Sequence, residues 1–156
     1  MKSASLNEIR KHLKTLDTDA LEQLCLRLGR YKKENKELLT YLLFEAHDEV
    51  AYVSGIKLEI DDLFETLPKG NVYFIKKGIR KILRVVNKQI KYSDIPATEL
   101  EVRIYFCLKM KSASIPLKEG TVLYNLYQQQ LRKVHQILSK LPEDLQFDYD
   151  AEMKRL

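Results

Sequence analysis

Residues 72–92 have the sequence VYFIKKGIRKILRVVNKQIKY, and this stretch decides which fold class the chain can adopt. Its apolar residues recur at spacings of three and four, which is the period of one face of an α-helix. They are Val72, Ile75, Ile79, Ile82, Leu83, Val86 and Ile90. We therefore expect one long amphipathic helix that follows Asn71 and ends near Tyr92.

The same helical spacing extends from this stretch toward the N-terminus. Ser5 and Glu8 match a capping box at the start of a short helix that ends near Thr15. A second helix is expected from Thr18 to Leu28, with Gly29 in the left-handed position that ends many helices. Residues 35–67 then keep helical spacing, and Asn35 is a good N-cap. The glycine at position 55 leaves open whether this segment is one kinked helix or two.

Toward the C-terminus, two more helices are expected. Thr98 and Glu101 suggest a second capping box, and the helix that follows has apolar residues on nearly every side, as in a helix buried between neighbours. The last long helix begins at about Pro116 or Thr121 and ends at Leu141, before a proline. In the tail, an apolar group is expected to pack back on the body while the final residues fray. The group comprises Leu145, Phe147 and Tyr149.

The composition agrees with an all-α fold. The 156 residues include only five glycines and four prolines, too few for the many tight turns of an all-β domain. We expect a single all-helical domain, residues 1–156, built as a bundle or stack of about six to seven helices in antiparallel hairpins. A short α-solenoid is the alternative, although no repeat of fixed period is evident.

The sequence also bears on the compartment of the protein. Cys25 and Cys107 both lie inside apolar helical patterns, so we expect two buried free thiols in a reducing environment. The N-terminal residues lack the apolar core of a signal peptide, and no stretch has 18 consecutive uncharged apolar residues. We expect a cytoplasmic protein without membrane insertion.

The helix expected over residues 72–92 is strongly basic on one side. No acidic residue occurs from Thr66 through Ser93, and the basic residues fall within about 140° of arc around the helix. These candidate binding residues, hereafter the basic face, are Lys76, Lys77, Arg80, Lys81, Arg84, Lys88 and Lys91. Such a face is able to bind nucleic-acid phosphates, an acidic protein partner or an anionic membrane surface.

An internal role for the basic face is the main alternative. Residues 34–65 contain nine acidic residues and two lysines, a net charge of −7. This acidic segment directly precedes the basic helix, so the two could pair within the fold and cancel each other's field. Tyr73 and Tyr92 bracket the basic face and are candidates for stacking on unpaired bases. Tyrosines that pack at the edge of a core are, however, more common.

Catalytic motifs are not evident in the sequence. Glu45, Asp48 and Glu49 share one side of a helix, but His47 lies two residues from Glu45 and points elsewhere, so a metal-ligand pattern is not formed. The sequence has no phosphate-binding glycine loop, dinucleotide turn or serine elbow. We predict no cofactor and no metal.

Taken together, the sequence favours a non-enzymatic protein-interaction domain, a scaffold or adaptor. The first alternative is a nucleic-acid-associated protein that uses helix 72–92. The second is an enzyme with an unrecognised site around residues 45–49. The sequence does not indicate an oligomeric state.

Overall fold

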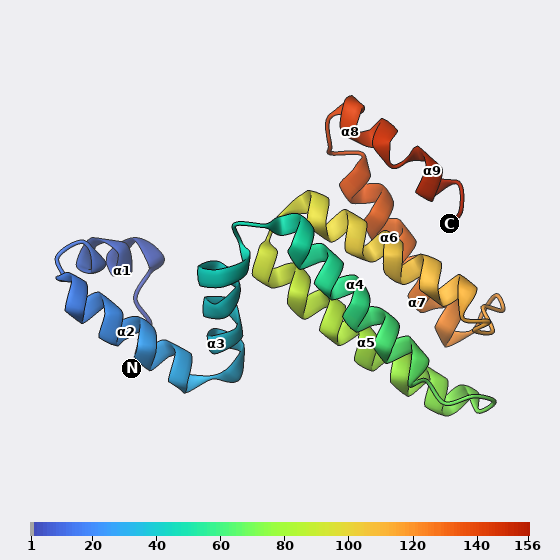
Figure 1. Cartoon of the computed structure of the whole chain (residues 1–156), viewed down its shortest axis with the longest axis horizontal. Coiled ribbons are helices and arrows are strands. Elements are labelled where there is room, and N and C mark those ends of the chain that lie inside the picture. The colour runs from blue at the N-terminus through green and yellow to red at the C-terminus, as the bar shows by residue number, and fades with distance from the viewer. Residues whose placement is uncertain (1) are drawn as a thin grey trace. The chain divides into compact units, whose positions relative to one another are not determined.

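A computed structural model describes residues 2–156, and helices account for 76% of the chain. Within the described residues there is no strand, so the expectation of an all-α protein is confirmed. The chain divides into two compact units, the first ending at Phe44 and the second running from Glu45 to Leu156. Figure 1 shows the helices in chain order.

The first unit contains three short helices, α1 (Leu6–Leu13), α2 (Thr18–Tyr31) and α3 (Lys33–Thr40). The capping box predicted at Ser5 is present, because the Ser5 side chain and the Glu8 side chain each accept a backbone N–H of the other residue. α2 packs against α3, and yet none of the three helices contains a buried residue. A five-residue π-helical turn, Tyr41–Glu45, follows α3 and reaches the second unit.

Three sequence predictions in this unit are wrong. Gly29 does not end α2 but lies inside it, where a Cβ atom would come 3.1 Å from Leu39 Cδ1, so the glycine allows α2 and α3 to approach closely. Asn35 is not an N-cap, because α3 begins at Lys33 and the Asn35 amide instead donates to the Leu28 carbonyl oxygen at 2.9 Å. Cys25 is exposed rather than buried.

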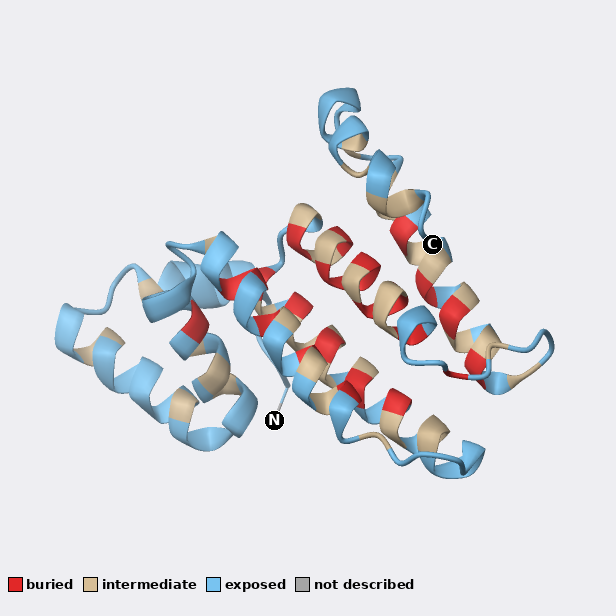
Figure 2. Ribbon diagram, turned by 45° about the vertical axis from the view of Figure 1, so that its right-hand side comes forward, coloured by how far each residue is buried: buried red, intermediate tan, exposed pale blue. Residues whose placement is uncertain are grey.

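The second unit is a helical bundle with a buried core. Its long helices are α4 (Glu49–Glu65), α5 (Val72–Ser93), α6 (Pro96–Ser112) and α7 (Val122–Leu138). Two short helices follow, α8 (Glu143–Asp148) and α9 (Asp150–Met153). α6 packs against α4, α5 and α7, so it occupies the centre of this unit. Figure 2 shows the buried residues along the sides of these helices that face one another.

The chemistry of α6 explains its central place. Leu100, Val102, Phe106, Cys107 and Met110 are fully buried. These residues point in different directions around the helix, and a helix that is apolar on nearly every side must be covered by several neighbours. The prediction that Cys107 is a buried free thiol is confirmed. Phe106 meets Phe64 of α4 edge to face, with ring centroids 5.9 Å apart.

The break within residues 35–67 lies before Gly55. α3 and α4 are separate helices, and the chain between them turns at residues 46–48, where the Asp48 carboxylate accepts the Ala51 N–H at 3.0 Å. Gly55 lies inside α4, and no atom would come within 4 Å of a Cβ atom there. The segment therefore forms two helices, and an N-cap rather than the glycine sets the boundary.

A second predicted capping box is also wrong. α6 begins at Pro96, three residues earlier than a Thr98 cap would place it, with Ile95 as its N-cap after Asp94 in a left-handed conformation with φ of 55°. Proline suits the first turn of a helix because the N–H it lacks would have no partner there. Thr98 is therefore inside α6, where its hydroxyl donates to Glu49 Oε1 of α4 at 2.6 Å instead of capping the helix.

The C-terminal residues return to the bundle. Tyr149, Met153 and Leu156 pack against a cluster that includes Leu100, Ile104 and Val134. The Tyr127 hydroxyl donates to the Leu156 main-chain oxygen at 2.7 Å. Of the tail residues expected to pack back, Tyr149 does so, whereas Leu145 and Phe147 are exposed.

Candidate functional site

The basic face of α5 lies largely in solvent. Lys77, Arg80, Lys81, Arg84 and Lys91 are exposed, while Lys76 and Lys88 are partly exposed. The opposite side of the helix supplies the buried residues Ile79, Ile82, Val86 and Ile90. Burial of this apolar side fixes the rotation of α5 about its axis, and it therefore holds the cations outward.

The acidic segment forms no ion pair with most of this face. Asp61 of α4 forms an ion pair with Lys109 of α6 at 2.8 Å and accepts the Tyr105 hydroxyl at 2.7 Å. Glu59 accepts the Gln89 side-chain amide at 3.0 Å, and Glu49 accepts the hydroxyls of Ser93 and Thr98. Within residues 2–156, no ion pair holds six of the seven predicted residues: Lys76, Lys77, Arg80, Lys81, Arg84 and Lys91.

A shallow hollow runs along the basic face. It has a volume of about 580 Å³ and is lined by α5 alone. The lining residues are Tyr73, Lys76, Lys77, Arg80, Leu83, Arg84 and Asn87. Four of them are cationic and none is acidic, so an anion in this hollow would meet positive charge only.

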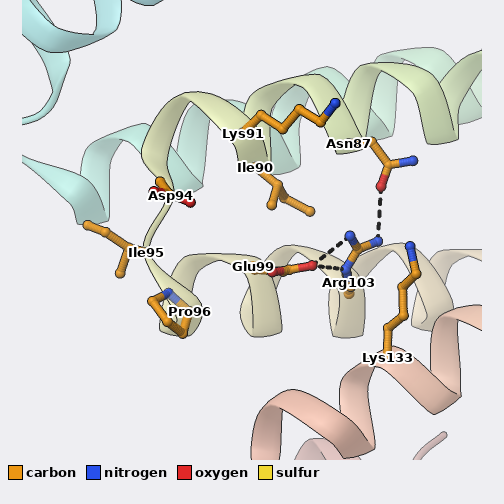
Figure 3. Close-up of a pocket in the computed structure, with 9 residues that line it drawn as sticks. All are labelled: Asn87, Ile90, Lys91, Asp94, Ile95, Pro96, Glu99, Arg103 and Lys133. Atoms are coloured by element: carbon orange, nitrogen blue, oxygen red, sulfur yellow. Dashed lines mark hydrogen bonds and ion pairs between the residues drawn. The ribbon is translucent and has the colours of Figure 1, made fainter. Parts of the chain in front are cut away.

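A deeper pocket adjoins this hollow at Asn87, which lines both. The pocket has a volume of about 470 Å³ and lies where the C-terminal end of α5 meets α6 and α7 (Figure 3). Its lining residues are Asn87, Ile90, Lys91, Asp94, Ile95, Pro96, Glu99, Arg103 and Lys133. Three different helices thus contribute a cation to one pocket.

Arg103 is the buried cation of this pocket, with 4% of its surface exposed. Its Nε donates to Glu99 Oε1 at 2.7 Å, and Nη2 lies 2.6 Å from the same oxygen. Nη1 donates to Gln130 of α7 at 2.7 Å and to Asn87 of α5 at 3.1 Å. A guanidinium group does not lose its proton in proteins, so these contacts fix a permanent positive charge between three helices.

Lys133 extends from α7 toward Arg103, as Figure 3 shows. Partial burial, with the nearby Arg103 charge adding to it, lowers the pKa of the Lys133 ammonium group, and Glu99 only partly offsets this. In the part of the chain that the structure describes, the ammonium group has neither a hydrogen bond nor an ion pair. The charge of Lys133 is therefore held close to a like charge without a counter-ion of its own.

Asn87, Arg103 and Lys133 were not predicted from the sequence as site residues. Lys133 lies among other polar residues of α7, and nothing in its spacing distinguishes it. Arg103 did carry a signal, because it is a permanent charge inside a helix that is apolar on nearly every side. A buried arginine needs several partners, and such partners lie on neighbouring helices, which the sequence alone does not place.

The other candidates from the sequence do not come together as a catalytic site. Glu45 and His47 are exposed, Asp48 caps α4, and Glu49 accepts bonds from Ser93 and Thr98. Across residues 2–156, no three His, Cys, Asp or Glu side chains gather as ligands of a metal ion would. Tyr73 is exposed and lines the hollow on α5, where its ring meets Phe74 edge to face. Tyr92 is partly exposed.

Comparison of the chain with known protein families, with curated proteins and with solved structures gave no match. Among the helices of the described residues, none has both the length and the apolar character that crossing a bilayer requires.

Proposed function

We propose that this protein binds nucleic acid through the basic face of α5. The observation that carries this proposal is that the face is largely exposed and that, within the described residues, no ion pair joins Lys76, Lys77, Arg80, Lys81, Arg84 or Lys91 to an acid. A helix rises 1.5 Å per residue, so the cations from Lys76 to Lys91 span roughly 22 Å, long enough to follow several phosphates of a strand. Each neutralised phosphate would release condensed counter-ions, which favours binding at low salt.

The expected binding does not depend strongly on sequence. Phosphate contacts position a protein on nucleic acid, whereas contacts with base edges specify a sequence. The basic face offers mainly Lys and Arg side chains, together with Tyr73 as an exposed ring on which an unpaired base is able to stack. A single-stranded ligand uses both features, so we expect it to bind more tightly than a duplex of equal length.

The test is fluorescence anisotropy with labelled single-stranded and duplex oligonucleotides over a salt series. The variant Arg80→Glu/Arg84→Glu reverses two charges of the basic face. The matched control, Lys118→Glu/Lys140→Glu, changes the net charge equally at exposed lysines outside it. We expect the first variant to lose affinity and to lower the salt slope by about 0.7 to 0.9 per lost contact. An equal loss of affinity in the control would mean that binding depends only on the net charge of the protein, which would contradict the proposal.

A second candidate function, contact with a protein partner, is favoured by the first unit. Its helices have apolar residues at helical spacing, and many of these are exposed: Leu6, Leu28, Tyr31, Leu42, Leu43 and Phe44. Covering one leucine side chain is worth about 1.5 to 3 kcal/mol, so a partner with a complementary apolar surface would bind here. A second copy of the chain is the partner to test first, by sedimentation equilibrium of the wild type and Leu28→Lys. A monomer at all concentrations would exclude self-association.

A further inference from the structure

We propose that the pocket between α5, α6 and α7 is a binding site for a phosphate monoester group, carried either by a small phosphorylated molecule or by the 5′ end of a nucleic-acid strand. If the phosphate belongs to the 5′ end of a nucleic-acid strand, the proposal rests on the proposed function; if it belongs to a small molecule, it does not. Recognition of the phosphate itself depends on the pocket alone.

The charge of the pocket favours a compact anion. Lys91, Arg103 and Lys133 face two carboxylates, Asp94 and Glu99, which leaves a net charge of +1. Glu99 is already bound to Arg103 through two nitrogen atoms and does not reach Lys91 or Lys133 through any ion pair of the described residues. A phosphate monoester carries a charge of about −1.5 to −2 at neutral pH, whereas a phosphodiester carries one negative charge. The net charge of the pocket suits a phosphate group of either kind, and access to Arg103 rather than charge distinguishes the monoester from the diester.

The donors of the pocket are held in place before a ligand arrives. Arg103 is fixed by Glu99, Asn87 and Gln130, and these contacts use four of the five N–H groups of a guanidinium. One N–H of Nη2 remains for a ligand. Asn87 accepts from Arg103 through its oxygen, so both N–H groups of its amide also remain available. Because little side-chain freedom is lost on binding, such donors bind more tightly than mobile surface lysines.

Lys133 supplies the observation that points to an anionic ligand. Its ammonium group is partly buried, directed toward Arg103 and without a partner in the described residues. An anion between Lys133 and Arg103 would turn this repulsion into two charge-assisted hydrogen bonds, which are stronger than neutral ones. The lowered pKa of Lys133 has the same physical origin, namely desolvation and the charge of Arg103. Lys91, exposed at the rim of the pocket, completes a three-sided arrangement of cations.

The position of the pocket connects it with the basic face. The pocket and the hollow on α5 share Asn87, so a strand with its terminal phosphate in the pocket would continue along Arg84 and Arg80. Arg103 is recessed, and an internal phosphodiester carries nucleotides on both sides that hinder its approach. A terminal phosphate has only one such neighbour. The 5′ end of a strand therefore fits the pocket better than an internal phosphate does.

The experiment compares three probes on the full chain: a 5′-phosphorylated oligonucleotide, the same oligonucleotide with a 5′-hydroxyl, and inorganic phosphate. Binding is followed by anisotropy for the oligonucleotides and by ¹⁵N–¹H NMR of the Asn87 side-chain amide for phosphate. The variant is Lys133→Gln. The matched control is Arg132→Gln, which removes one charge from the exposed neighbouring position of the same helix.

We expect the 5′-phosphate to bind about tenfold more tightly than the 5′-hydroxyl, as one charge-assisted hydrogen bond would give. Lys133→Gln should abolish this preference, whereas Arg132→Gln should keep it. A saturable shift of Asn87 with inorganic phosphate, lost in Lys133→Gln but without any preference for the 5′-phosphate, assigns the site to a small phosphorylated molecule. This NMR result stands even if neither oligonucleotide binds and the proposed function fails. Absence of both effects, or a preference that survives in Lys133→Gln, overturns the proposal.

Discussion

At the scale of single residues, the two cysteines have opposite surroundings and should differ in reactivity. Burial raises the pKa of the Cys107 thiol to about 12, while the charge of Arg103 only partly opposes this. Cys25 is exposed on α2. Because the thiolate is the reactive form, we expect a disulfide reagent at pH about 8 to modify Cys25 readily and Cys107 only after denaturation. Colorimetric titration of thiols before and after addition of guanidinium checks this; reaction of both thiols at similar rates in the native protein would contradict it.

Leu100 tests how tightly the centre of the second unit is packed. Its side chain is fully buried on α6, so the change Leu100→Ala should leave a cavity and lower the free energy of unfolding by about 2 to 5 kcal/mol. Leu58→Ala is the control, because Leu58 is 66% exposed on α4 and its loss should change stability by no more than about 0.5 kcal/mol. Urea unfolding followed by circular dichroism measures both. A similar loss in the two variants would mean that the core is loosely packed.

The burial of a residue was predictable from the sequence only where residues close to it in the chain determine that burial. Cys25 and Cys107 have similar apolar neighbours at helical spacing, and both were expected to be buried. Only Cys107 is buried, because three helices surround α6, whereas nothing buries any residue of α2. Periodicity shows which side of a helix is apolar, but it does not show whether another helix covers that side. The basic face was predictable because it follows from spacing within one helix. The partners of Arg103 were not, because two of them lie on other helices.

At the scale of elements, Asp61 links α4 to α6 in a pH-dependent way. Partial burial raises the pKa of Asp61, but hydrogen bonds from Lys109 and Tyr105 outweigh it, so the net pKa lies below its ordinary value. A carboxyl group with a lowered folded-state pKa stabilises the fold above its unfolded pKa of about 4 and loses this effect as the pH falls through the folded value.

The variant Asp61→Asn should therefore be less stable than the wild type at pH 7, by up to about 1 kcal/mol for a partly exposed pair. This difference should shrink at pH about 3, which lies below the unfolded pKa of about 4, so that the unfolded state binds the proton more readily than the folded state does. Urea unfolding at both pH values measures the effect. Asp62→Asn is the matched control, since Asp62 is exposed and should show little difference at either pH. A difference for Asp61→Asn that does not depend on pH would contradict the linkage.

Helix boundaries were predictable where a local cap sets them. Ser5 and Thr121 act as N-caps close to where the sequence placed them, and α5 begins directly after Asn71. The boundaries that were wrong involve contacts between helices. Gly29 lies inside α2, where Leu39 of α3 approaches it closely, and Thr98 bonds to Glu49 of α4 rather than to its own backbone. Residue preferences for caps and glycines describe local chemistry, and tertiary contacts override them.

At the scale of the whole molecule, the protection of backbone amides from hydrogen exchange should differ between the two units. The buried residues of the second unit are many and contiguous, whereas α1, α2 and α3 bury none. Amides exchange through local opening, and opening costs least where few apolar contacts are lost. Hydrogen exchange followed by mass spectrometry should find the slowest amides in α6 and much faster ones in α1–α3. Equal protection in both units would show that a partner or a second copy covers the first unit.

The central place of α6 has a consequence for synthesis on the ribosome. The chain emerges with its N-terminal end first, so α4 and α5 are complete before any residue of α6 exists. Both helices pack against α6, and the sides of α4 and α5 that contact α6 remain uncovered until α6 has been made. At the usual elongation rate, the 17 residues of α6 take about 1 to 3 seconds to add. During that interval the apolar sides of α4 and α5 are available to a chaperone or to other apolar surfaces.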